Sequence, residues 1–216
     1  MMDQASAYNG GAHTLTGAKA SFGTGNTVGS LSEEERAVVV GSLLGDGAMR
    51  CKTNALLEVN HSLAQKDYVD WKYRKLQRLV RTPPKARRGN EDRMAYRFTT
   101  RSLPELTGLY RWFYEARRKR VPDDLQISPL ALAVWVMDDG CKSHRAMYLN
   151  TQQFKLGEQE LLIEILQAQY GIRATLNRDK RYTRIRIAVD SVARLYEVVR
   201  SHVLPCLRYK FPLMTP

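Results

Sequence analysis

The sequence has few cysteines, no long apolar run and no recognisable export signal. Cys51, Cys141 and Cys206 are odd in number and widely spaced, which disfavours a disulfide framework or a cysteine-rich zinc site and favours a reducing compartment. No segment is apolar for long enough to span a bilayer. The N-terminus lacks the apolar core of a secretory signal. We therefore expect a protein that is not secreted, does not bind membranes and works in the compartment where it is made.

Acidic residues are also scarce relative to basic ones. The 216-residue chain has 34 Lys and Arg but only 22 Asp and Glu, which gives a formal net charge of +12 and a pI of about 9.8. Such a charge favours DNA or RNA as partner, because Lys and Arg release counterions from phosphates. An anionic membrane surface would require a basic amphipathic helix, and the basic residues do not form one.

One nine-residue pattern occurs twice, as an apolar helix that ends in an acid followed by glycine. The copies are Val39–Gly47 (VVGSLLGDG) and Leu132–Gly140 (LAVWVMDDG). A single Asp-Gly after a helix is usually only a turn, but two equivalent copies favour a function for Asp46 and Asp139. Two carboxylates brought together at helix C-termini repel each other, so a divalent cation such as Mg²⁺ is expected between them.

The order of expected elements also repeats. Residues 1–30 are rich in small polar residues and are interpreted as a flexible leader. Ser32 and Glu35 then form a capping box for a buried helix that Gly47 ends. Two repeats, 31–122 and 123–216, each follow the order helix, two strands, helix, two strands, helix, which predicts an α+β fold. Further helices are expected at 65–80, 104–117, 129–139, 157–169 and 191–202, and strands at 49–52, 56–62, 93–101, 146–151, 173–178 and 184–189.

Gly41 and Gly45 lie four residues apart on one face of the first motif helix. This spacing favours close approach of a partner helix. The second motif has Val134 and Asp138 at the corresponding places, so the contact is expected to be asymmetric.

The two motifs resemble the signatures of the single-chain LAGLIDADG homing endonucleases, in the intron-encoded meganuclease branch. The resemblance continues through Tyr148–Phe154 and Tyr209–Pro212 and covers about residues 33 to 212. It implies two pseudo-symmetric αββαββα repeats, a saddle of strands in the DNA major groove and a double-strand cut that leaves 3′ overhangs. The first motif departs from the family name at Gly45 and Leu44, but not at its metal-binding position.

The resemblance also implies the site residues. The metal-binding acids fall on Asp46 and Asp139, and the preceding Gly45 and Asp138 complete the metal set for Mg²⁺, with Mn²⁺ as a substitute. By the same resemblance a basic residue from each half lies beside the scissile phosphates. These residues are Lys210 and Lys119, expected to stabilise charge in the transition state. Gln153 is a candidate for the solvent network.

The strands are expected to carry DNA recognition. Arg184 and Arg186 alternate with apolar residues, and Arg97, Thr99 and Arg101 do the same in the first half. Such faces suit the major groove, where Arg pairs with guanine and Asn or Gln with adenine. The other expected DNA-contacting residues are Arg50, Lys52, Glu58, Asn60, Asn150, Gln152 and Arg178. The basic residues expected in turns, where they would bind phosphates, are Lys85, Arg87, Arg88, Lys180 and Arg181.

The sequence thus predicts a monomeric, Mg²⁺-dependent endonuclease for a long, non-palindromic DNA site, in the bacterial cytoplasm or in the organelle that encodes it. One alternative is an RNA maturase on the same scaffold, with host intron RNA as its partner. Another is a DNA-binding protein whose catalysis has decayed. A transcription regulator on this scaffold would carry a helix-turn-helix module, which we do not expect after Pro216. The four histidines show no ligand spacing among themselves or with cysteine.

Overall fold

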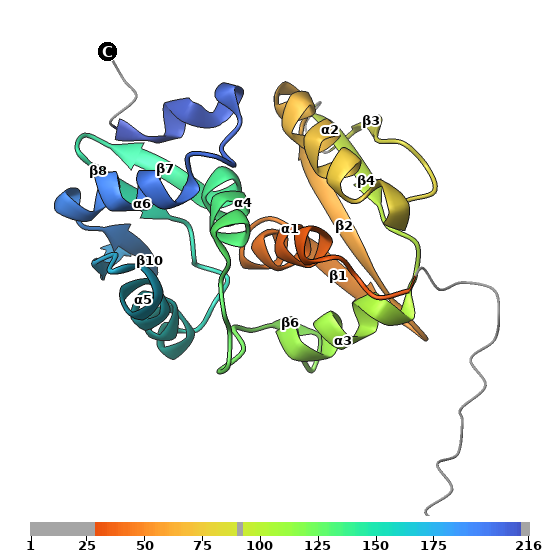
Figure 1. Cartoon of the computed structure of the whole chain (residues 1–216), viewed down its shortest axis with the longest axis horizontal. Helices are drawn as coiled ribbons and strands as arrows, with labels where there is room; N and C mark the ends of the chain where they lie inside the picture. Colours follow the sequence, from red (N-terminus) through yellow and green to blue (C-terminus); the bar gives the residue numbers. More distant parts are fainter. Residues whose placement is uncertain (1–28, 90–92, 213–216) are drawn as a thin grey trace, which may run out of the picture.

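The computed structural model describes residues 29–89 and 93–212. The expected leader at 1–30 therefore lies almost entirely outside the described residues. The described chain forms two halves that lie side by side (Figure 1). Both halves contain helices and an antiparallel sheet in the order expected from the sequence, which confirms the α+β fold of two αββαββα repeats.

The N-terminal half contains one sheet of four strands and three α-helices. Its elements are α1 (Glu33–Leu44), β1 (Ala48–Cys51), β2 (Ala55–Ser62), α2 (Lys66–Lys75), β3 (Lys85–Arg88), β4 (Met94–Thr99) and α3 (Pro104–Phe113). A short hairpin of β5 (Tyr114–Glu115) and β6 (Arg118–Lys119) follows. The strand order in the sheet is β1-β2-β4-β3.

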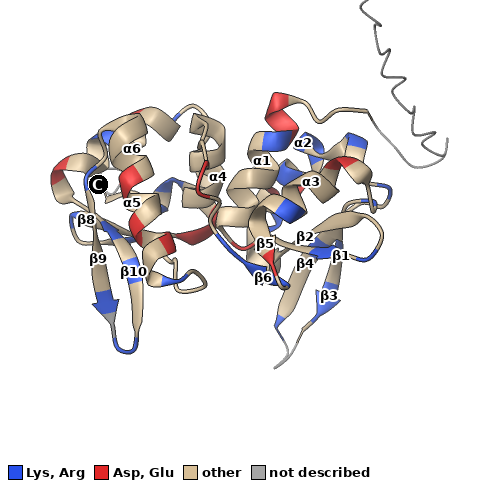
Figure 2. Ribbon diagram, turned by 90° about the horizontal axis from the view of Figure 1, so that it is seen from below, with Lys and Arg blue, Asp and Glu red and all other residues tan. Residues whose placement is uncertain are grey.

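The C-terminal half repeats this arrangement. Its elements are α4 (Pro129–Asp139), β7 (Gly140–Ser143), β8 (Ala146–Leu149), α5 (Leu156–Tyr170), β9 (Ala174–Asp179), β10 (Tyr182–Ile187) and α6 (Val192–Val199). The strand order β7-β8-β10-β9 matches that of the first sheet position for position. In both halves the strands extend to the same side of the helices, and Lys and Arg are spread along the strands of both sheets (Figure 2).

The two motif helices, α1 and α4, pack against each other at the centre of the molecule (Figure 1). Most of their side chains are buried, including Leu43 and Trp135, which are fully inaccessible. A Cβ at Gly41 would lie only 2.4 Å from the carbonyl oxygen of Ala131 and 2.6 Å from Cβ of Val134. The glycine face therefore lets the helices approach closely, and the contact is asymmetric, as expected.

Several element boundaries differ from the sequence predictions. The capping box of Ser32 and Glu35 is present, but α1 ends at Leu44 with Gly45 as C-cap, before Gly47. The helix expected at 65–80 is shorter, because α2 ends at Lys75 and a 3₁₀ turn at Gln77–Leu79 follows. The prediction of a helix over 104–117 is wrong at its end, because the chain leaves α3 at Phe113 and forms the β5–β6 hairpin.

Lys85, Arg87 and Arg88 were expected in turns, and this prediction is wrong. They form β3, which pairs with β4 at the edge of the first sheet. The Pro83-Pro84 pair that ends the preceding helical region leads directly into this strand. The repeat order calls for a strand before β8, but no residues were assigned to it, since the β7 sequence Gly-Cys-Lys-Ser carries little strand propensity. Within residues 29–89 and 93–212, no helix is both long and apolar enough to cross a membrane.

Candidate metal centre and nucleic-acid interface

Asp46 and Asp139 lie at the C-terminal ends of α1 and α4, where the two halves meet. The Asp46 side chain is half exposed, whereas Asp139 is buried. Burial raises the pKa of Asp139 to about 8, with further contributions from the charges of Asp46 and Asp138. Burial also raises the pKa of Asp46, and the charge of Asp138 adds to this effect. The charge of Asp46 thus acts on Asp139 across the contact between the halves.

One oxygen of this pair has no protein partner. Among the residues that the structure describes, Oδ2 of Asp139 is buried and accepts no hydrogen bond. A buried carboxylate oxygen without a partner is costly, and a divalent cation would relieve both this cost and the repulsion from Asp46. Hard oxygen donors of this kind suit Mg²⁺ or Ca²⁺, so Asp46 and Asp139 fit a divalent ion.

Three polar residues expected at the site donate to backbone carbonyls around it. The Lys119 ammonium donates to the carbonyl oxygens of Gly45 and Gly47 at 2.9 and 2.7 Å. The Lys210 ammonium donates to those of Met137 and Asp138 at 2.5 and 2.8 Å. Gln153 donates to Leu44 and Gly45 at 3.0 and 3.2 Å. Each half thus places one lysine beside one aspartate of the pair.

Burial makes both lysines easier to deprotonate. It lowers the pKa of Lys119 to about 8, against the opposing effect of the nearby aspartates. It also lowers the pKa of Lys210. Both ammonium groups lie among the carboxylates and carbonyls at the contact between the halves.

A buried cluster beside this pair was not expected from the sequence. Oδ1 and Oδ2 of Asp138 accept from the Lys72 ammonium at 2.8 and 2.9 Å, and Oδ1 accepts from the Tyr68 hydroxyl at 2.6 Å. His61 lies nearby, with Nδ1 3.6 Å from Oδ2 of Asp46. Burial is the main cause that lowers the pKa of His61 to about 4, which leaves the ring neutral near pH 7.

Asp46, His61 and Asp138 each offer a ligand atom, all within 4.8 Å of one another. The Lys72 ammonium already neutralises Asp138, however, so these three residues are not a bare anionic site. His61 faces inward from β2, between the outward-facing Asn60 and Ser62. The alternation of residues along this strand was the one sequence signal that could have placed His61 on the face opposite the expected DNA-contacting residues.

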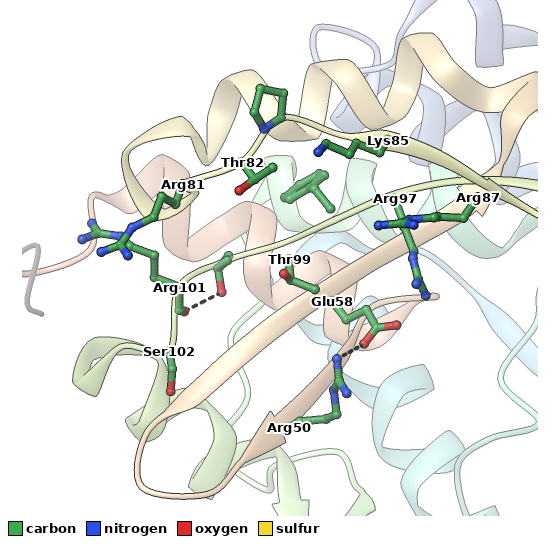
Figure 3. Close-up of a pocket in the computed structure, with 13 residues that line it drawn as sticks. Arg50, Glu58, Arg81, Thr82, Lys85, Arg87, Arg97, Thr99, Arg101 and Ser102 are labelled. Carbon is green, nitrogen blue, oxygen red and sulfur yellow. Dashed lines mark hydrogen bonds and ion pairs between the residues drawn. The ribbon is translucent and has the colours of Figure 1, made fainter.

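The outer face of the first sheet forms a basic groove of about 560 Å³. Figure 3 shows its side chains, including Lys85, Arg87 and Arg97 from β3 and β4 and the Arg50–Glu58 ion pair from β1 and β2. Thr99 and Arg101 also line it. These expected DNA-contacting residues are brought together, and Lys52 follows at the exposed end of β1. Arg81, which the sequence analysis did not select, lines the same groove.

A second groove of about 810 Å³ runs along β2 and β4 and includes Asp46. Glu58 lines both grooves, and Asn60 and His61 line the second. Asn60 pairs in register with Arg97, which places the two side chains on one face of the sheet. The polar face of the first half is therefore continuous with Asp46.

In the second sheet, the expected DNA-contacting residues do not all lie on one face. Arg184 and Arg186 alternate with the buried Ile185 and Ile187, and the Arg184 guanidinium stacks 4.2 Å from the Tyr148 ring centroid. Arg178 pairs in register with Thr183 and so lies on the opposite face from Arg184. Lys180 and Arg181 form the exposed turn between β9 and β10, as expected. Asn150 and Gln152 follow β8, and the backbone N–H of Asn150 donates to the Asp139 carbonyl oxygen at 3.2 Å.

Comparison with known proteins agrees with this geometry. The model of the LAGLIDADG DNA endonuclease family matches residues 36–195. A probable intron-encoded endonuclease 1 from Wickerhamomyces canadensis is 26% identical over 197 residues, which cover 84% of this chain and 85% of that protein. A cytochrome b mRNA maturase bI2 from Debaryomyces hansenii is 26% identical over 200 residues, covering 83% and 74%.

Solved structures are similar too. The homing endonuclease I-WcaI bound to its DNA recognition sequence superposes with a TM-score of 0.78 at 25% identity, over 84% of this chain and 87% of that chain. I-DmoI in complex with DNA and Ca has a TM-score of 0.51 at 13% identity, over 83% and 96%. The second similarity concerns the fold alone.

Proposed function

Because the chain belongs to the LAGLIDADG DNA endonuclease family, we propose that it is a homing endonuclease for a long, non-palindromic DNA site. It cuts both strands and leaves 3′ overhangs. The observation that carries this proposal is the coupled pair Asp46 and Asp139, one from each half, at the end of a basic strand face. Because one aspartate comes from each half, the pair fits a reaction in which each half acts on one strand of the DNA.

In this proposal the carboxylates of Asp46 and Asp139 would hold divalent metal, next to Gly45 and Asp138, the other members of the proposed metal set. Mg²⁺ is the proposed ion and Mn²⁺ its substitute. When bound, such an ion lowers the pKa of a coordinated water and stabilises negative charge on the phosphate. Lys119 and Lys210 supply positive charge beside the scissile phosphates, and Gln153 orients solvent. The carbonyl contacts of these side chains fix their positions before DNA arrives.

The strand faces hold the duplex in this proposal. A two-stranded ribbon fits the major groove, where Arg97, Arg184 and Arg186 are suited to guanine and Asn60 to adenine. Exposed basic residues at the sheet edge and in the β9–β10 turn bind phosphates, which carry most of the affinity but no sequence information. Because the two sheets carry different residues on their outer faces, the two DNA half-sites differ and a single chain suffices.

The test is a cleavage selection on randomised duplex DNA, with and without Mg²⁺, for the wild type and for Asp46→Asn. Asn keeps the shape of Asp but loses its charge, so cutting should fall by at least about 100-fold. Binding to the selected duplex in Ca²⁺ should remain. Equal cutting by both proteins would contradict the assignment of Asp46, and an absence of cutting by the wild type would contradict the nuclease itself.

The similarity to a maturase supports a second candidate function. The same basic surface would bind folded intron RNA and assist its splicing. A splicing assay with intron RNA, run on Asp46→Asn, separates the two functions. Splicing support that survives in this variant would add an RNA partner, whereas cutting of DNA should not survive.

A further inference from the structure

We propose that the side chain of Asp138 is a positioning residue, which fixes Asp46 across the contact between the two halves. This inference rests on the proposed function, in which Asp46 holds metal. The two motifs differ at the position before the aspartate, with Gly45 in the first and Asp138 in the second. The pseudo-symmetric fold therefore contains one extra carboxylate, on one side only.

The Asp138 side chain leaves α4 and enters the N-terminal half, where it is fully buried. Lys72 and Tyr68, both on α2 and both fully buried, donate to its carboxylate. Its Oδ2 accepts a further hydrogen bond from the backbone N–H of Asp46, at 3.2 Å. One carboxylate thus joins α4, α2 and the backbone of the residue that carries the proposed metal ligand.

Gly45 provides the space for this carboxylate. A Cβ at this position would lie 2.5 Å from Cβ and 2.6 Å from Oδ2 of Asp138. No side chain fits there without displacing Asp138. The glycine of the first motif and the acid of the second motif are therefore complementary, because the missing Cβ at position 45 leaves room for the Asp138 side chain.

The charge balance explains why Asp138 positions Asp46 without acting as a second metal ligand. Its two oxygens face the Lys72 ammonium, which occupies the place that a cation would need. Nε2 of His61 lies 3.4 Å from the same ammonium and 3.7 Å from Oδ1 of Asp138. The buried charge is thereby paired with Lys72, and the carboxylate also accepts from the Tyr68 hydroxyl and from the Asp46 backbone N–H.

The first experiment compares Asp138→Asn with Glu35→Gln. Glu35 forms an ion pair with Arg78 at the opposite end of α1, so its variant reports the effect of removing an ion pair away from Asp46. For Asp138→Asn we expect kcat at saturating Mg²⁺ to fall at least tenfold and the half-saturating Mg²⁺ concentration to rise. DNA affinity in Ca²⁺ should stay within twofold. Equal kcat in both variants would overturn the proposal.

The second experiment removes the ion pair without leaving a buried charge, in Asp138→Leu/Lys72→Met. Apolar replacement of a buried ion pair is often neutral for stability, but the Asp46 N–H then lacks its acceptor. We expect a folded protein with kcat still at least tenfold below the wild type. A folded variant with wild-type kcat, or one that does not fold, would assign the pair a structural role only. Asp46→Asn in the same assay tests the proposed function separately, because it should abolish cutting whether or not Asp138 positions it.

Discussion

At the scale of single residues, the site brings several ionisable side chains together in a largely buried place. Asp139 is buried with one oxygen unpartnered, and its neighbours Asp46 and Asp138 are also acids. Lys119, Lys210 and Lys72 offset this charge only in part, because each faces carbonyls or a single carboxylate. This uneven pairing is what raises the pKa of Asp139 and leaves its Oδ2 without a hydrogen bond.

This arrangement predicts the pH dependence of stability in metal-free protein. The folded-state pKa of Asp139 is raised to about 8 from an ordinary 3.8. Between these values the folded state binds a proton that the unfolded state has lost, so this group makes stability fall as pH rises. The slope is at most about 1.4 kcal/mol per pH unit. Urea denaturation of wild type and Asp139→Asn in chelator, from pH 5 to 8, measures it.

In Asp139→Asn this contribution to the slope should disappear, and at pH 8 the variant should be more stable than the wild type. Addition of Mg²⁺ should stabilise the wild type more than the variant. Parallel stability curves for the two proteins would contradict the assignment of the raised pKa to Asp139.

At the scale of elements, the α1–α4 pair sets the distance between the two aspartates. The two helices can pack this closely because Gly41 and Gly45 have no side chains. Atoms of α4 occupy the space in which the Cβ atoms of other residues at these positions would lie. Glycine weakens an isolated helix, and the capping box of Ser32 and Glu35 offsets part of that loss in α1. The helix is thus defined by its cap and by burial more than by its own propensity.

Gly41→Ala should therefore destabilise the protein by about 1–3 kcal/mol, as expected for overpacking, and should lower cutting by separating the aspartates. Gly108→Ala is the matched control, because this glycine lies in α3 with no atom near its absent Cβ. That variant should be neutral or stabilised by up to about 1 kcal/mol. Urea denaturation of both variants measures the difference, and similar values for the two would contradict close packing at Gly41.

At the scale of the whole molecule, the excess of Lys and Arg is distributed along both sheets, on the side away from the helices (Figure 2). The first sheet carries a basic groove, whereas the second carries Arg184 and Arg186 on its outer face and Lys180 and Arg181 in the β9–β10 turn. The two halves therefore share a fold but offer different surfaces. This difference is what a non-palindromic target requires.

The Lys180→Ala/Arg181→Ala variant should weaken binding uniformly across DNA sequences. It should reduce the slope of log K against log salt by about 0.9 for each phosphate that the variant no longer neutralises. Arg97→Ala should instead relax sequence preference at one position, at a cost of about 1–3 kcal/mol. Arg200→Ala, at the exposed end of α6, is the control and should leave the salt slope unchanged. Salt titrations of duplex binding measure all three, and an unchanged slope for the turn variant would exclude phosphate binding by the turn.

The sequence alone determined the repeat, the motif helices and the two aspartates, because these depend on local periodicity and on residue types at fixed spacing. The sequence also indicated that Arg184 and Arg186 lie on one face of their strand and Ile185 and Ile187 on the other. It could not assign β3 or the β5–β6 hairpin, since pairing with a neighbouring strand and positive φ values at Ala116 and Arg117 override weak local preferences.

Only the tertiary structure decided which side chains surround the aspartates. His61, Tyr68 and Lys72 lie far before Asp138 in the chain, and no local pattern links them to it. Their contact follows from α1 and α4 packing closely enough for one carboxylate to cross between the halves. Periodicity specifies which face of a helix is buried, but the identity of the atoms that meet there depends on the packing of both halves together.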